Sequence, residues 1–79
     1  MDERTVPLRL DLRGLKCPLP ALHARRALER AAPGAAIIVE CTDPMAVIDI
    51  PHMVRQDGHL LDGQETEGDV LVFRLRKAG

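Results

Sequence analysis

Apolar and polar residues alternate from Pro7 to Leu12, with leucine at every second position and charged residues between them. This period of two is typical of a strand that is buried on one face. From Pro18 to Ala32 the apolar residues follow a helical spacing, and the predicted inner stripe consists of Ala21, Ala24, Leu28 and Ala31. Pro33-Gly34 ends this helix, because proline cannot continue it and glycine tolerates left-handed geometry.

A second strand and a second helix follow. The run from Ala35 to Cys41 is almost entirely apolar, which indicates a central strand. Asp43-Pro44 is typical of a helix N-cap followed by proline at the first helical position. This helix meets Pro51, so we expect it to be kinked or divided in two, with Asp49 as the N-cap of its second half. Gly58 is the expected C-terminal stop.

The chain closes with a predicted hairpin. His59 to Thr66 and Asp69 to Arg76 are its strands, and Glu67-Gly68 is the tight turn between them. The element order is therefore β-α-β-α-β-β. It predicts an α+β fold, a two-layer α/β sandwich in which a four-stranded mixed sheet carries two helices on one face, because right-handed crossovers place both helices on the same side. The other face is left open to solvent or to a partner.

The length of 79 residues corresponds to a single domain, residues 1–79. A domain of this size buries only about 60% of the surface of its unfolded chain. Phe73 is the one aromatic residue, so the core is built from aliphatic side chains and leaves no room for a deep substrate cavity. We therefore expect any chemistry to take place at the surface.

Charge and hydropathy narrow the function classes. The 11 basic and 12 acidic residues nearly cancel, which argues against a nucleic-acid partner. No apolar run approaches the roughly 20 residues that cross a bilayer, and Met1 to Arg4 do not begin a signal peptide. We expect a cytoplasmic protein, where thiols are kept reduced. A structural disulfide between Cys17 and Cys41 is therefore disfavoured, and two free thiols are expected.

The most informative residue is Cys17, which falls at the predicted N-cap of the first helix. Pro18 and Pro20 would occupy its first turn, where they fix the backbone and donate no hydrogen bond. The remaining N–H groups of that turn and the neighbouring Lys16 would stabilise a thiolate. The sequence thus predicts that the pKa of Cys17 lies below the free value of about 8.5.

Few reactions suit a thiol in this setting. A C-x-x-C dithiol is absent, and His23 lies about a turn and a half further along the helix, which is poor geometry for a general base. A lone activated thiolate suits attack on the terminal sulfur of a persulfide, because that sulfur–sulfur bond is intrinsically labile. The alternative is that Cys17 is a small buried apolar residue.

The segment from Leu10 to Pro20 resembles the L-D-x-R/A-G-x-x-C-P-x-P signature of the TusA/SirA-like family, and includes Arg13 and Gly14 as well as the cysteine and both prolines. Further matches are Asp43-Pro44, Asp49-Ile50-Pro51 and Gly58-His59. The similarity covers residues 8–76. The resemblance implies the same β-α-β-α-β-β fold and a persulfide on Cys17, loaded by a donor such as a cysteine desulfurase or a rhodanese-like protein, with no cofactor.

One departure from the family pattern concerns a second thiol. Many members carry another cysteine in the second helix, whereas residues 52–55 are His-Met-Val-Arg here. Cys41 ends the predicted central strand and is expected in the core. The histidines His23, His52 and His59 match no zinc-site spacing, so no metal is expected.

Basic residues on the first helix form a candidate docking surface. Arg25, Arg26 and Arg30 lie near Lys16 and Cys17, and Leu22 is the apolar residue among them. This surface is either a solvated helix face or a docking site for acidic partners.

The main hypothesis is a sulfurtransferase that accepts sulfane sulfur on Cys17 and passes it to an acceptor protein. One alternative is a nucleic-acid-binding or protein-binding regulatory module in which the thiol is incidental; another is a redox sensor that pairs Cys17 with Cys41. The sequence leaves open the oligomeric state and the pathway, whether transfer RNA thiolation, molybdenum-cofactor supply, thiosulfate handling or sulfur oxidation.

Overall fold

The computed structural model describes residues 7–78. The initial residues, in which no signal peptide was expected, and the last residue lie outside this range. The elements are β1 (Leu8–Leu12), α1 (Leu19–Arg30), β2 (Ala36–Cys41), α2 (Ala46–Gln56), β3 (Leu60–Glu67) and β4 (Val70–Arg76). The predicted element order is confirmed.

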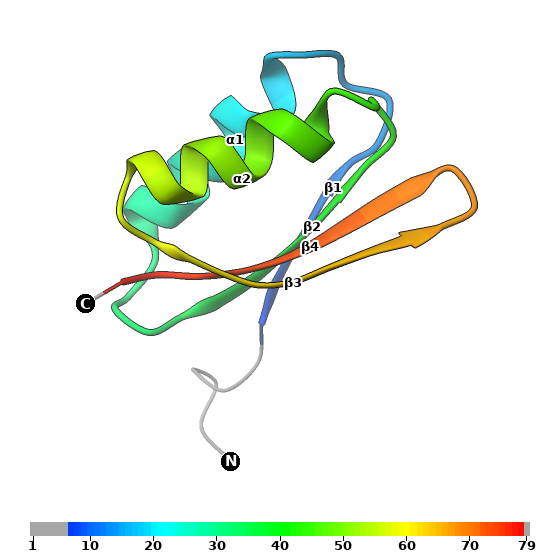
Figure 1. The fold of residues 1–79 in the computed structure, drawn as a ribbon. Helices are drawn as coiled ribbons and strands as arrows, with labels where there is room; N and C mark the ends of the chain where they lie inside the picture. Colours follow the sequence, from blue (N-terminus) through cyan, green and yellow to red (C-terminus); the bar gives the residue numbers. More distant parts are fainter. Residues whose placement is uncertain (1–6, 79) are drawn as a thin grey trace.

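The strands form one mixed sheet in the order β1-β2-β4-β3. β1 and β2 are parallel, whereas β4 runs antiparallel to both β2 and β3. Both helices cover the same face of the sheet (Figure 1). The predicted two-layer sandwich is therefore confirmed.

The core lies between the helices and the inner face of the sheet. Ala24 and Leu28 of the predicted helical stripe are fully buried there. Val39 of β2 is paired with Phe73 of β4, and both are also fully buried. The single aromatic ring thus lies in a core of mainly aliphatic side chains, in which burial of apolar surface is the main stabilising force.

The outer face of the sheet is charged. Arg9 and Glu40 form an ion pair across β1 and β2 at 2.5 Å, and Arg74 pairs with Glu65 across β4 and β3. These side chains alternate along their strands with the buried residues, so they occupy the opposite face. Partly exposed ion pairs of this kind add little stability, but they suit this face to contact with water.

The second helix differs from its prediction, because it is continuous. Pro51 lies inside α2 without dividing it. The carbonyl that would have accepted the missing N–H belongs to Val47, which is 42% exposed, so water can satisfy it. The expected stop is confirmed at Gly58, where φ is 78° and the next N–H donates to the carbonyl of Val54 at 2.8 Å.

The hairpin turn is displaced by one residue from its predicted position. Glu67 pairs with Val70, so the two turn residues are Gly68 and Asp69. Gly68 has a φ of 60°. Two-residue hairpin loops use type I′ or type II′ turns, and both types require a positive φ at the first turn residue. Glycine adopts this conformation without strain, which explains why it occupies that position.

Two leucines of α1 provide a test of the packing. Leu28 is fully buried and Leu22 is 49% exposed. Leu28→Ala should lower the free energy of unfolding by about 2–5 kcal/mol, because it leaves a cavity in the core. Leu22→Ala, the matched control, should change it by about 0.5 kcal/mol or less. Urea unfolding measures both, and equal losses would contradict the described orientation of α1.

Candidate functional site

The loop between β1 and α1 lies against the connection between β2 and α2. Because the first two strands are parallel, with Leu12 opposite Cys41, the segments that follow them leave the same edge of the sheet. The N–H of Gly14 donates to Thr42 Oγ1 at 2.9 Å, and Gly14 has a φ of 87°, which glycine adopts without strain. Leu15 packs against the core and so attaches the loop to the rest of the fold.

Cys17 sits on this loop as an exposed free thiol between two carboxylates. Its N–H donates to Asp43 Oδ2 at 2.5 Å, and its S–H donates to Asp49 Oδ2 with an Sγ–Oδ2 distance of 2.8 Å. Asp43 also accepts the N–H of Met45 through Oδ1 at 3.0 Å. Asp43 therefore joins the cysteine loop to Met45, the N-cap of α2.

The prediction that Cys17 is the N-cap of the first helix is wrong. The helix begins at Leu19, Pro18 precedes it, and no side chain caps it. The N–H of Leu19 donates to the carbonyl of Lys16 at 2.8 Å, so that donor is not available to the thiolate. Pro20 is buried and anchors the helix start.

The predicted lowering of the thiol pKa is also wrong. The pKa of Cys17 is raised, mainly by the hydrogen bond to the Asp49 carboxylate, then by desolvation and by the charges of Asp49 and Asp43. The Lys16 ammonium instead helps to lower the pKa of Asp43, after the larger effects of the N–H groups of Met45 and Cys17. The resting cysteine is accordingly a neutral thiol at neutral pH.

Arg13 belongs to the supporting structure. Its guanidinium donates to both carboxylate oxygens of Asp11, at 2.7 and 2.9 Å. This contact lowers the pKa of Asp11 to about 2 and raises that of Arg13. The pair fixes the exit of the chain from β1.

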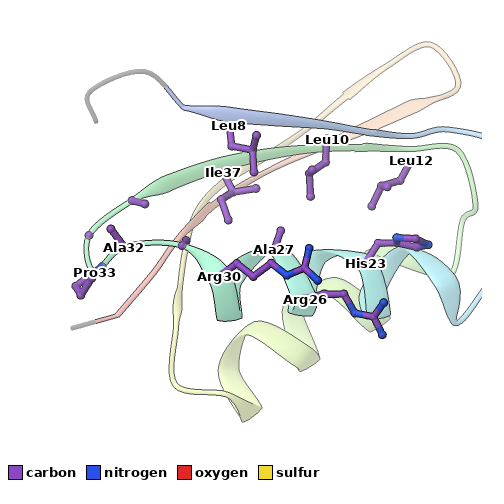
Figure 2. Close-up of a pocket in the computed structure, with 13 residues that line it drawn as sticks. Leu8, Leu10, Leu12, His23, Arg26, Ala27, Arg30, Ala32, Pro33 and Ile37 are labelled. Atoms are coloured by element: carbon purple, nitrogen blue, oxygen red, sulfur yellow. The ribbon is translucent and has the colours of Figure 1, made fainter. Parts of the chain in front are cut away.

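The predicted docking surface divides into two parts. Arg25 is tied to the end of α2 through an ion pair with Asp57 at 2.7 Å. Arg26 and Arg30, together with His23, line a groove of about 520 Å³ between α1 and β1. Figure 2 shows the leucine side chains of β1 pointing into this groove. The described part of the chain supplies no carboxylate within ion-pair distance of Arg26 or Arg30.

Cys41 lies in the core, as predicted. It is fully buried, and burial raises the pKa of its thiol to about 11. A buried thiol that stays protonated is a poor partner for a redox pair with Cys17. Within residues 7–78 there is no cluster of three or more potential metal ligands. Neither α1 nor α2, the two helices of this range, has the length and apolar character of a membrane span.

Sequence reasoning missed the contact of the two carboxylates with Cys17. The sequence predicts both Asp43 and Asp49 as helix caps, and both predictions are wrong. The N-cap of α2 is Met45, with no side-chain cap, and Asp43 accepts the N–H of Met45 from outside the helix. Asp49 lies inside the continuous helix and bonds the sulfur. The available signal was the parallel pairing of the first two strands, which brings the residues after both strands to one edge.

Comparison with known proteins supports a family assignment. Residues 8–77 match the family described as sulfurtransferase TusA. Protein NMA0882 of Neisseria meningitidis serogroup A is 47% identical over 67 residues, 84% of this chain and 86% of that protein. The sulfur carrier protein TusA of Allochromatium vinosum is 36% identical over 69 residues, 87% of this chain and 91% of that protein.

A crystal structure with the same fold is that of the SirA-like protein DSY4693 from Desulfitobacterium hafniense. The TM-score is 0.78 and the identity 20%, and the match covers 91% of this chain and 99% of that one. Together with the match over residues 8–77, these findings show that the chain belongs to the TusA sulfurtransferase family and that its role is in sulfur transfer.

Proposed function

We propose that this protein carries sulfane sulfur as a persulfide on Cys17, between a donor protein and an acceptor protein. The observation that carries the proposal is the exposed thiol of Cys17 on a loop fixed by Asp43. The other cysteine is buried, so it cannot meet a partner's sulfur. An exposed thiol on a rigid loop can enter the active site of a second protein.

The proposed reaction exchanges one sulfur atom between two thiols. Cys17 Sγ attacks the terminal sulfur of a donor persulfide, a new sulfur–sulfur bond forms, and the donor's own sulfur–sulfur bond breaks. The donor cysteine leaves with the electron pair and becomes a thiol once protonated. The sum is donor persulfide plus Cys17 thiol giving donor thiol plus Cys17 persulfide. There is no net oxidation, and neither a metal nor a cofactor is needed.

The donor we propose is a cysteine desulfurase or a rhodanese-like protein, and the site of action is the cytoplasm. We propose α1 as the docking surface. Leu22 offers an exposed apolar contact, and Arg26 and Arg30 offer charges that complement an acidic partner (Figure 2). Arg25 contributes less to this surface, because Asp57 already holds its guanidinium.

Loading tests the carrier proposal. Incubation with a cysteine desulfurase and cysteine should add one reducible sulfur atom, seen as a gain in intact mass. Cys17→Ser should abolish the gain, because it removes the nucleophile. Cys41→Ala, the matched control at the buried cysteine, should load like the wild type. Retained loading of Cys17→Ser would refute the proposal.

Charge reversal tests the docking surface. Arg26→Glu combined with Arg30→Glu should slow loading by a desulfurase about tenfold or more at low salt, since steering by opposite charge accelerates association by about 10- to 1,000-fold. The difference from wild type should shrink as salt rises. Arg74→Glu, on the charged outer face of the sheet, is the control and should load at the wild-type rate. An equal effect of the control would assign the loss to net charge alone.

A further inference from the structure

We propose that Asp49 is the proton acceptor for Cys17: its carboxylate takes the thiol proton when Cys17 attacks a persulfide, and returns a proton to Cys17 when the sulfur is handed on. This inference rests on the proposed carrier function. It assigns a catalytic residue to that reaction, because Asp49 contacts the reacting sulfur itself.

The Asp49 carboxylate is already in contact with the Cys17 sulfur in the protein without a partner. Asp49 Oδ2 lies 2.8 Å from Cys17 Sγ. Asp49 belongs to the first turns of α2, and the residue after it, Ile50, is fully buried in the core. The loop is fixed from the other side by the Cys17 N–H to Asp43 contact of 2.5 Å. The Cys17 loop is therefore held by Asp43, and the proton acceptor is held on a helix that packs on the core.

The neighbouring charged groups are already engaged elsewhere. Both oxygens of Asp43 accept backbone N–H groups, those of Met45 and Cys17. The Lys16 ammonium helps to lower the pKa of Asp43, after the larger effects of the Met45 and Cys17 N–H groups. The Arg13 guanidinium on the same loop is paired with Asp11. Among the described residues, the Cys17 thiol is the one side-chain donor to the Asp49 carboxylate, which separates this role from that of Asp43.

The thiol proton moves from Sγ to Asp49 as the Sγ electron pair forms the bond to the terminal sulfur of the donor persulfide. The donor's sulfur–sulfur bond breaks, and its electron pair stays on the donor cysteine. That thiolate then receives the proton from Asp49, directly or through water. In the delivery step an acceptor thiol passes its proton to Asp49 as its sulfur attacks the terminal sulfur of the Cys17 persulfide. The Cys17 sulfur–sulfur bond breaks, its electron pair stays on Cys17 Sγ, and Asp49 returns the proton to Sγ.

This arrangement gives the carrier a defined selectivity. Without a partner the sulfur stays protonated beside two carboxylates, so it reacts slowly with small electrophiles, which require the thiolate. Docking removes water from an exposed site, and a carboxylate in a water-poor interface binds a proton more strongly. In the docked complex the Asp49 carboxylate would thus be a stronger proton acceptor than it is in solution.

Asp49→Asn separates two effects of the carboxylate, the raising of the Cys17 pKa and the acceptance of the thiol proton during loading. Alkylation of Cys17 by iodoacetamide should become faster at pH 7, and its pH profile should shift to lower pH, because the main cause of the raised thiol pKa is removed. Loading by a cysteine desulfurase with cysteine should become slower, by about 100-fold or more, as is usual for the loss of a general base. Glu65→Gln, on the outer face of the sheet, makes the same change of charge and should alter neither rate.

The outcomes distinguish this role from others. If Asp49→Asn accelerates both alkylation and loading, the carboxylate only suppresses the thiolate and the proposal is overturned; unchanged rates would also overturn it. Asp49→Glu, which keeps the carboxylate, should recover part of the loading rate, and this variant decides the question if Asp49→Asn fails to fold. Failure of the wild type to load under any donor would instead refute the carrier function itself.

Discussion

The parallel pairing of β1 with β2 is the constraint on which the rest of the site depends. It brings the cysteine loop and the start of α2 to one edge of the sheet, with Leu12 opposite Cys41. Hydrogen bonds from Gly14 to Thr42 and from Cys17 to Asp43 then join the two segments. The site is therefore a product of topology, because residues 26 positions apart in the chain become hydrogen-bond partners.

The electrostatics of the site follow from this junction and not from the helix start. A thiolate at the N-terminus of α1 would have been stabilised by the free N–H groups there. In the structure the sulfur lies next to Asp49, and its pKa is raised instead of lowered. A persulfide exchange needs a nucleophile only at the moment of contact with a partner. For the proposed carrier function, a neutral thiol beside a carboxylate would meet that requirement without exposing a reactive thiolate.

Much of the fold could be predicted from local pattern. Leu10 and Leu12 of the alternating segment and Leu28 of the helical stripe all face the core in the structure. Burial of apolar surface determines the orientation of these elements. Predictions from the local sequence were wrong at positions where tertiary contacts determine the structure. Pro51 does not interrupt α2, since the surrounding helix is packed on the core. Asp49 was assigned to a helix cap because the sequence shows its neighbours in the chain and not the sulfur that it meets across the fold.

The central claim is that Cys17, and not Cys41, carries the transferred sulfur. Mass spectrometry of the tryptic fragments of the loaded protein tests it most directly, since cleavage after Lys16 and after Arg25, Arg26 and Arg30 places the two cysteines on separate fragments. We expect one additional, reducible sulfur on the fragment that begins with Cys17 and none on the fragment that contains Cys41. Sulfur on the Cys41 fragment, or on neither fragment after incubation with a competent donor, would contradict it.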